Sequence, residues 1–218
     1  GNPNDDLTGS DAAASLGYCY NAAESDSVYG AAPPAIGYDM VQGPYDAASG
    51  RRLGATAFSR FVNGADPDTS TETTNVMRGL SLTGQPLVDP VEASPTRFMF
   101  NGDPIAATGW RDLVGQDERM LLTAGPFSMP SGAEQEVVLA IILAQGSDRL
   151  NSLALLRDYD AVVQSAFDNG SLPVLAVDVP AAPALALNRA FPNPSRGELT
   201  LTFTLPGTET RPTSLRPR

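Results

Sequence analysis

The sequence predicts a mainly β protein: an antiparallel β-sandwich with one packed α-helix. Glycine and proline contribute 20 and 19 of the 218 residues, and this frequency of turn residues favours short strands over long helices. Short runs of alternating apolar and polar residues lie between the turn residues, as expected for half-buried strands. One longer segment instead repeats its apolar residues at helical spacing. A chain of this length is expected to hold one domain, or one domain and a fragment.

Alternation of apolar residues predicts several strands in the first two thirds of the chain. Residues 16–20 and 36–40 give the clearest alternation. The remaining predicted strands are residues 54–62, 97–100, 120–122, 127–129 and 136–144. Residues 65–74 are polar and predict a loop, whereas residues 75–82 fit a short helix and a strand equally well. A Pro-Ser-Gly turn separates the last two predicted strands, which is typical of an antiparallel sandwich.

Residues 147–169 are predicted to form a helix that packs on the core. Ser147 is a suitable N-cap, Asp148 lies in the first turn, and Gly170 stands just beyond the end. The apolar residues of the segment recur three, four and seven positions apart, at Leu150, Leu153, Leu156, Val163 and Phe167. This spacing places them on one face, which is typical of a helix packed against a sheet.

The composition excludes most familiar catalytic chemistry. The chain contains no His, and all 14 of its basic residues are Arg. Ser-His-Asp triads, imidazole zinc sites, P-loop lysines and Schiff-base lysines therefore cannot be built from it. Paired carboxylates remain, and they define an alternative function, a secreted carboxylate-based glycoside hydrolase. Tyr45 and Trp110 are available to stack on a sugar. The candidate acids lie in predicted loops and are Glu72, Asp103, Asp112, Asp117 and Glu118.

The net charge of −11 restricts the expected partners. So acidic a chain repels nucleic-acid phosphates and anionic membrane surfaces, so neither is expected to bind it. It suits Ca²⁺, which binds carboxylate and amide oxygens. Two oxygen-rich loops supply the candidate calcium ligands, which are Asp5, Asp6, Asp11, Asn63, Asp66 and Asp68. The second loop is not an EF-hand, because Thr71 and Met77 stand where that loop needs Gly and Glu. The alternatives are a solvated terminus for the first loop and an acidic turn for the second.

Cys19 is the single cysteine, so no disulfide can form within the chain. It lies in a predicted strand and is interpreted as a small buried hydrophobe rather than a nucleophile. No run of 18 apolar residues is present, which predicts that no segment spans a membrane. The chain begins at Gly1 rather than Met, which predicts a processed piece of a longer protein.

A proline-rich turn followed by an alternating strand lies near the end of the sequence. The turn contains Phe191, Pro192, Asn193 and Pro194, and Gly197 follows it. The apolar residues of the strand are Leu199, Leu201, Phe203 and Leu205. This segment resembles the opening of the C-terminal sorting domain of the type IX secretion system, which begins with a Tyr/Phe-Pro-Asn-Pro motif.

The resemblance to the sorting domain covers residues 185–206. It implies a small Ig-like fold, recognition by the type IX secretion machinery, and a secreted or outer-cell-surface location. Residues 207–218 lack the strand pattern of the family, so the sorting domain is interpreted as truncated, with a tail outside the family pattern.

Two other segments resemble sequences from the same setting. Residues 119–170 are similar to the region that precedes sorting domains in large secreted proteins of Bacteroidota-like bacteria, which implies a location but no activity. The triplet Asp26, Ser27 and Val28 is similar to a short O-glycosylation acceptor motif of such bacteria, with Ser27 as the acceptor.

These observations predict three parts. Residues 1–172 are expected to form a β-rich extracellular module, 173–187 a linker rich in Pro, Ala and Val, and 188–218 the truncated sorting domain. We expect a non-catalytic structural or binding module of a secreted or cell-surface protein, with calcium as a stabilising ion. Adhesion, glycan binding and extracellular assembly are the expected roles, and self-assembly by strand addition is one form of the last.

Overall fold

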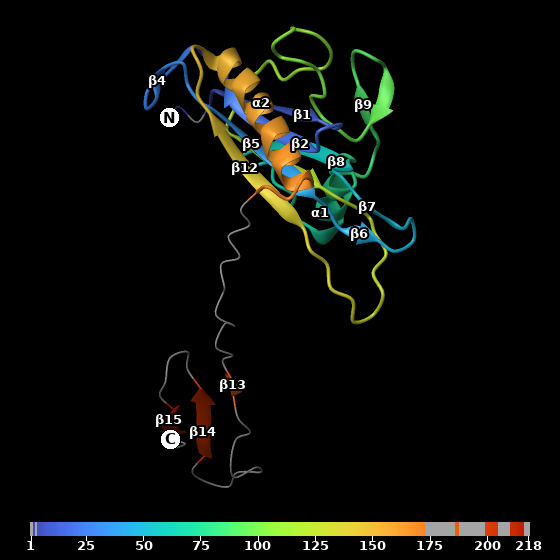
Figure 1. Cartoon of the computed structure of the whole chain (residues 1–218), viewed down its shortest axis with the longest axis vertical. Coiled ribbons are helices and arrows are strands. Elements are labelled where there is room, and N and C mark those ends of the chain that lie inside the picture. The colour runs from blue at the N-terminus through green and yellow to red at the C-terminus, as the bar shows by residue number, and fades with distance from the viewer. Residues whose placement is uncertain (1, 3, 173–185, 188–198, 205–209, 216–218) are drawn as a thin grey trace. The chain divides into compact units, whose positions relative to one another are not determined.

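The structure is a computed structural model, and it describes residues 2, 4–172, 186–187, 199–204 and 210–215 (Figure 1). The chain divides into two compact units, Gly1–Leu172 and Pro173–Arg218. The protein is mainly β, with several antiparallel sheets, as the sequence predicts. Neither helix in the described part is long and apolar enough to cross a membrane.

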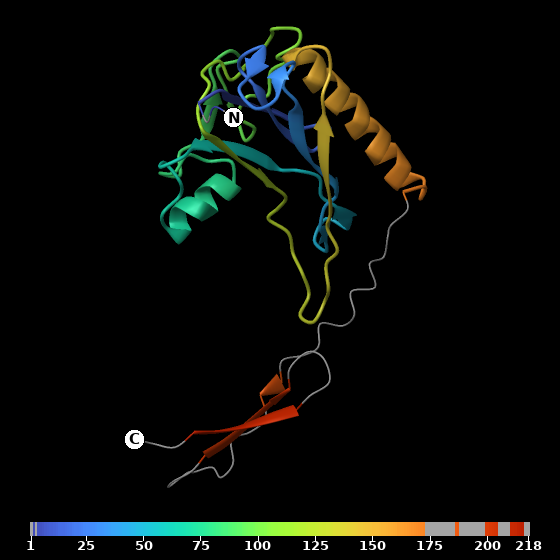
Figure 2. The same ribbon diagram turned by 90° about the vertical axis from the view of Figure 1, so that its left-hand side faces the viewer.

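A four-stranded antiparallel sheet forms the centre of the first unit. Its strands are β1 (Asp6–Asp11), β2 (Leu16–Asn21), β5 (Ala35–Gln42) and β12 (Val138–Ala144), in the order β1-β2-β5-β12. Helix α2 (Arg149–Asp168) covers one face of this sheet (Figures 1 and 2). The core lies between them and contains Leu16, Tyr18, Ile142, Leu153 and Leu156. These are the alternating strand residues and the helical stripe that the sequence predicts.

Helix α2 begins two residues later than predicted. Its N-cap is Asp148, not Ser147, because the Asp148 carboxylate accepts hydrogen bonds from the backbone N–H groups of Leu150 and Asn151. The negative charge of an ionised carboxylate at this position also interacts favourably with the positive end of the helix dipole. The prediction of one long packed helix is otherwise confirmed.

A two-stranded ribbon packs on the opposite face of the sheet. It consists of β8 (Ala57–Val62) and β11 (Glu118–Thr123), which pair antiparallel. The fully buried Phe58 lies directly over Gly17 of β2, where a Cβ atom would be only 2.6 Å from the ring. The ribbon contacts β1 and β2 (Figure 2). Half of the sheet therefore has a second layer on this face.

Short hairpins and one short helix complete the first unit. The hairpins are β3 (Ser25–Asp26) with β4 (Gly30–Ala31), β6 (Tyr45–Asp46) with β7 (Arg51–Arg52), and β9 (Leu87–Asp89) with β10 (Ser94–Thr96). The helix is α1 (Ser70–Met77), which overlaps the predicted polar loop. Thr69 and Glu72 form a reciprocal capping box at its start, and this local signal starts a helix in a polar sequence.

Two predicted strands are absent from the described part. Residues 97–100 form only a single bridge, between Phe98 and Phe58, because Phe100 adopts a positive φ of 52° and leaves the extended conformation. Residues 127–129 are not a strand either. There the backbone of Ser128 bonds the turn of the β6–β7 hairpin, accepting from Ala47 N–H and donating to the Asp46 carboxylate.

The second unit contains a three-stranded antiparallel sheet in its described residues. The strands are β13 (Ala186–Leu187), β14 (Leu199–Thr204) and β15 (Thr210–Leu215). Strand β14 is the predicted alternating strand. Strand β15 lies in the tail where no strand was predicted, and it pairs with β14 along its whole length. The motif residues Phe191, Pro192, Asn193, Pro194 and Gly197, like most of the predicted linker, lie outside the described residues.

Candidate functional site

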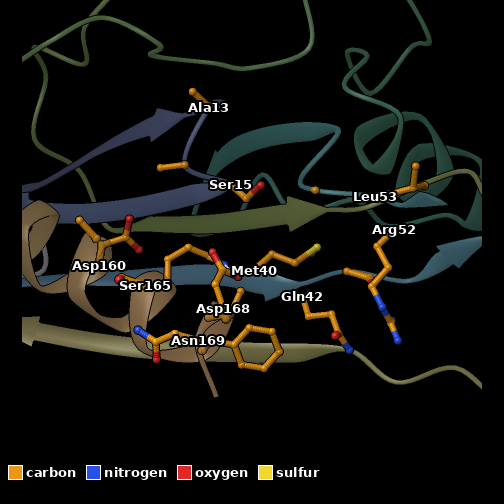
Figure 3. Close-up of a pocket in the computed structure, with 17 residues that line it drawn as sticks. Ala13, Ser15, Met40, Gln42, Arg52, Leu53, Asp160, Ser165, Asp168 and Asn169 are labelled. Carbon is orange, nitrogen blue, oxygen red and sulfur yellow. Dashed lines mark hydrogen bonds between the residues drawn. The ribbon is translucent and has the colours of Figure 1, made fainter. Parts of the chain in front are cut away.

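A cavity of about 930 Å³ opens beside the C-terminal half of α2. We call it the α2 cavity. Asp160, Ser165, Asp168 and Asn169 line it from the helix (Figure 3). The facing wall comes from the turn between β1 and β2, the end of β5, and the segment after β7. It includes Ala13, Ser15, Met40, Gln42, Arg52 and Leu53.

Two carboxyl groups meet at the edge of the α2 cavity. Asp39 of β5 is 0% exposed and Asp160 is 5% exposed. Both carboxylate oxygens of Asp39 and Oδ1 of Asp160 lack a hydrogen-bond donor among the described residues, and the two groups are within hydrogen-bonding reach of each other. Two ionised carboxylates cannot form that bond, so their contact favours a proton on one of them.

Burial raises the pKa of Asp39 to about 7, with further contributions from the charge of Asp160 and the hydrogen bond to it. Burial also raises the pKa of Asp160, and the charge of Asp11 acts in the same direction. No Arg forms an ion pair with either group among the described residues. Burial and mutual contact therefore favour the protonated form of Asp39, and its partner Asp160 lines the α2 cavity.

The sequence analysis missed this pair. Asp39 occupies an inward position of β5, in register with the buried Ala35 and Gly37. Asp160 follows Leu156 by four residues, on the face of α2 that contacts the sheet. In the sequence, Asp39 is one acidic residue at a core position of a predicted strand, and Asp160 is one acidic residue on the apolar face of a predicted helix. Neither position alone indicates a site, because only the fold brings the two carboxyl groups together.

A second acid pair is formed by two of the candidate catalytic residues, Asp112 and Glu118. Their side chains are 2% and 0% exposed. Arg60 lies between them, with Nε 2.8 Å from Glu118 Oε1 and Nη2 3.6 Å from Asp112 Oδ1. Burial and the hydrogen bond to Asp112 raise the pKa of Glu118 to about 8. One guanidinium neutralises one carboxylate, so the second holds a proton.

The other candidate catalytic acids are apart from this pair. Glu72 caps α1, Asp103 pairs with Arg157, and Asp117 accepts a hydrogen bond from Asn63. Trp110 packs edge-on against the buried Phe100 at a ring distance of 5.3 Å, and Tyr45 lies on the β6–β7 hairpin. Glycosidase carboxyl groups stand about 5 Å or more apart to admit the sugar. Both acid pairs here are in hydrogen-bonding contact, which leaves no such room.

The candidate calcium ligands fall into three places. Asp5 and Asp6 line a small cavity of about 210 Å³ together with Asp26. Asp11 lies at the far end of β1, where its carboxylate accepts from the N–H groups of Ala13 and Ala14. In the second predicted loop, the guanidinium of Arg119 contacts both Asp66 and Asn63. The backbone N–H of Asp68 donates a hydrogen bond to the Glu72 carboxylate. No group of three or more acidic or thiol side chains in the described part is arranged to hold a metal.

Two predicted residues remain, Ser27 and Cys19. Ser27 is exposed in the turn between β3 and β4, and the Asp26 carboxylate holds that turn by accepting from Val28 and Tyr29 N–H. Cys19 is largely buried in β2. Burial raises the pKa of its thiol to about 12, so it is a thiol rather than a reactive thiolate at neutral pH.

The outer face of β12 is a surface without a partner. Leu139, Ile141 and Leu143 point away from α2 and are 60%, 63% and 64% exposed. A cleft of about 520 Å³ runs between this face and the ribbon, with Tyr38 and Leu122 in its walls. The ribbon covers β1 and β2 but leaves β5 and β12 open. We call the exposed side chains of Leu139, Ile141 and Leu143 the β12 face.

The two edges of the four-stranded sheet differ. At the β1 edge, Thr8 N–H donates to Asp112, Ser10 N–H donates to the Phe100 carbonyl at 3.1 Å, and Gln116 N–H donates to the Asp6 carbonyl at 3.2 Å. No strand pairs with the outer edge of β12 within the described residues. The sequence of β12 contains no charge, Pro or Gly that would discourage pairing.

Comparisons with protein-family models, with curated proteins and with solved structures found no match to this chain.

Proposed function

We propose that this chain is a non-catalytic module of a secreted or cell-surface protein, and that it assembles with further copies through β12. The observation that carries the proposal is the open edge of β12, with its exposed apolar face, in a sheet whose other edge is covered. Location follows from the resemblance of residues 185–206 to a type IX sorting domain. In this proposal the ribbon and the sheet form an incomplete sandwich, and the second unit is an Ig-like sorting domain.

An open apolar strand edge favours pairing with another chain. Unpaired N–H and C=O groups form a template for a further strand, and soluble proteins normally block such edges with charge, Pro or a covering segment. Strand β12 has none of these within the described residues, although loop residues cover β1. The edge is therefore better suited to binding than to lying in solvent.

The sequence of β12 is close to self-complementary. Two copies that meet antiparallel around Ile141 place Leu139 of one copy opposite Leu143 of the second copy. The side chains of each pair then lie on the same face, because alternate residues of a strand share a face. The joined β12 faces form a larger apolar surface on which a second layer can pack, as extended extracellular assemblies require.

Replacing Ile141 with Lys tests the assembly. Size-exclusion chromatography with light scattering is expected to give a dimer or larger species for the full chain and a monomer for Ile141→Lys. Since Ile141 is 63% exposed, the melting temperature of the variant is expected to change little. The matched control is Val162→Lys, which changes a side chain that is 65% exposed on α2. A monomeric wild-type chain, or equal masses for wild type and Ile141→Lys, contradicts the proposal.

The alternative, a carboxylate-based glycoside hydrolase, is less well supported. Asp112 and Glu118 do form a pair, and Glu118 lines the cleft beside the β12 face. Their mutual contact and the neighbouring Arg60 describe a buried ion-pair network rather than an open acid pair. Glycan binding without cleavage remains compatible with the proposed surface role.

We place the predicted calcium at the N-terminal loop, where Asp5, Asp6 and Asp26 line one cavity. These carboxylates are not clustered as a metal site by themselves, so backbone carbonyl and water oxygens would complete the ligands. Burial is the largest cause of the raised pKa of Asp6, and the charges of Asp5 and Asp26 add to it, so a cation would relieve repulsion. Calcium, compared with EDTA, is expected to raise the melting temperature by about 5 °C. Asp5→Asn should remove this difference, and Asp66→Asn should retain it, since Arg119 already contacts Asp66. A melt that is the same in calcium and EDTA contradicts the site.

A further inference from the structure

The strongest unexplained feature of the first unit is the Asp39–Asp160 pair. Both side chains are more than nine-tenths buried, and three of their four oxygens lack a hydrogen-bond donor among the described residues. A buried carboxylate without a counter-charge destabilises a folded chain, and it is normally found with a cation or a set of donors. Asp160 also lines a large cavity, and Asp39 lies behind it, closed off from solvent.

The charge around the α2 cavity favours a cation. Asp160 and Asp168 line the cavity, Asp39 adjoins Asp160, and Asp11 adds negative potential at Asp160. Arg52 is the one cationic residue lining the cavity. Its Nη1 donates to the carbonyl oxygens of Gly43 and Glu136, each at 3.1 Å. That guanidinium therefore has partners of its own, and the carboxyl pair is left without one.

The wall opposite the carboxyl pair favours an organic cation. Val41, which shares the α2-facing side of β5 with Asp39, and Leu53 give the cavity an apolar side. Figure 3 shows Asp160 on the helix and Leu53 on a segment separate from β5. A calcium ion takes six to eight oxygen ligands, and no cluster of three acidic side chains is arranged for a metal in the described part. An ammonium group needs only a few acceptors, and an alkyl chain matches the apolar wall.

We propose that the α2 cavity binds an alkylammonium group, with the ammonium on Asp160 of the Asp39–Asp160 pair and the alkyl chain along Val41 and Leu53. The ligand class includes primary amines and the lysine side chain of a partner. The 218 residues contain no Lys, so no lysine side chain among them occupies the cavity. Binding displaces the shared proton, because an ammonium donates the hydrogen bonds that the proton otherwise provides.

The test is a titration of the full chain with n-butylammonium chloride, followed by amide NMR shifts. The neutral isostere 1-butanol is the matched ligand control. At pH 8 we expect saturable shifts at the α2 cavity with butylammonium and none with 1-butanol. At pH 5 we expect binding at least tenfold weaker, since the pair then retains its proton while the amine stays charged.

Variants of the pair test whether these two carboxyl groups bind the ammonium, or whether the overall negative charge of the protein is enough. Asp39→Asn and Asp160→Asn keep the side-chain shape and are expected to reduce binding at pH 8 more than tenfold. Asp158→Asn removes an exposed carboxylate of α2 that does not line the cavity, and it is expected to change affinity less than threefold. Equal binding of butanol and butylammonium overturns the proposal, as does full affinity in Asp160→Asn. Saturable binding of calcium at lower concentration, lost in the same two variants, also overturns it and assigns the cavity to a metal.

Discussion

At pH 8 the Asp39→Asn chain is expected to melt about 6 °C above the wild-type chain, and at pH 4.5 the two should melt at nearly the same temperature. The pKa of Asp39 is raised from 3.8 to about 7, which corresponds to about 4 kcal/mol. Because Asp160, the partner of Asp39, lines the α2 cavity, we expect about half of this, or about 2 kcal/mol, to appear in the free energy of unfolding.

The direction of the pH dependence follows from proton binding. Folded Asp39 holds its proton up to about pH 7, whereas the unfolded group loses it near 3.8. Between these values the folded chain carries more protons than the unfolded chain, so its stability falls as pH rises. Glu118 acts in the same direction up to about pH 8. Asp46, with its pKa lowered to about 2 mainly by the Ser128 N–H, acts in the opposite direction, but only below pH 4.

Thermal melts of Asp39→Asn and wild type from pH 4.5 to pH 8.5 measure this effect. An Asn amide donates permanently to Asp160, so it replaces the titrating proton with a fixed donor. Asp168→Asn is the control, since Asp168 is exposed on the same helix and accepts a hydrogen bond from Gln164. If Asp39→Asn keeps the pH dependence of the wild type, the two carboxyl groups do not share a proton in solution.

The elements that the sequence predicts well are those specified locally. Leu16, Tyr18 and Tyr20 alternate and all lie on the helix-facing side of β2. The helical stripe of α2 is equally local, and its Leu153 and Leu156 are fully buried. In both cases one face is buried and the other is not, so the period of the apolar residues identifies the element.

The elements and sites that the sequence does not predict depend on distant partners. Strand β5 is apolar on both faces, so the alternation of Ile36, Tyr38 and Met40 gave no indication that Asp39 faces α2. The partner, Asp160, lies in an element far along the chain. The apolar run around Phe98 predicts a strand. The turn at Phe100 ends the extended segment, and this turn depends on a hydrogen bond from the Ser10 N–H of β1 to the Phe100 carbonyl.

Leu156→Ala is expected to lower the free energy of unfolding by about 3 kcal/mol, and Leu139→Ala by less than about 0.5 kcal/mol. Leu156 is fully buried between α2 and the sheet, whereas Leu139 is 60% exposed on the opposite face. Removing Leu156 leaves a cavity in the core, and removing Leu139 leaves none. Chemical denaturation of dilute, monomeric protein measures both. Equal losses for the two variants would show that the β12 face is covered within the chain, and the assembly proposal would fail.

Substitution of Gly37 tests whether Leu156 of α2 packs directly against β5. A Cβ atom at Gly37 would lie 2.9 Å from Cδ2 of Leu156, so Gly37→Ala alone is expected to destabilise by overpacking. In the Leu156→Ala background the added methyl group instead enters the vacated space. The double variant should therefore be more stable than the sum of the single losses predicts, by about 1 kcal/mol. Additive losses would mean that Leu156 and Gly37 do not touch, and that α2 does not pack on β5 as described.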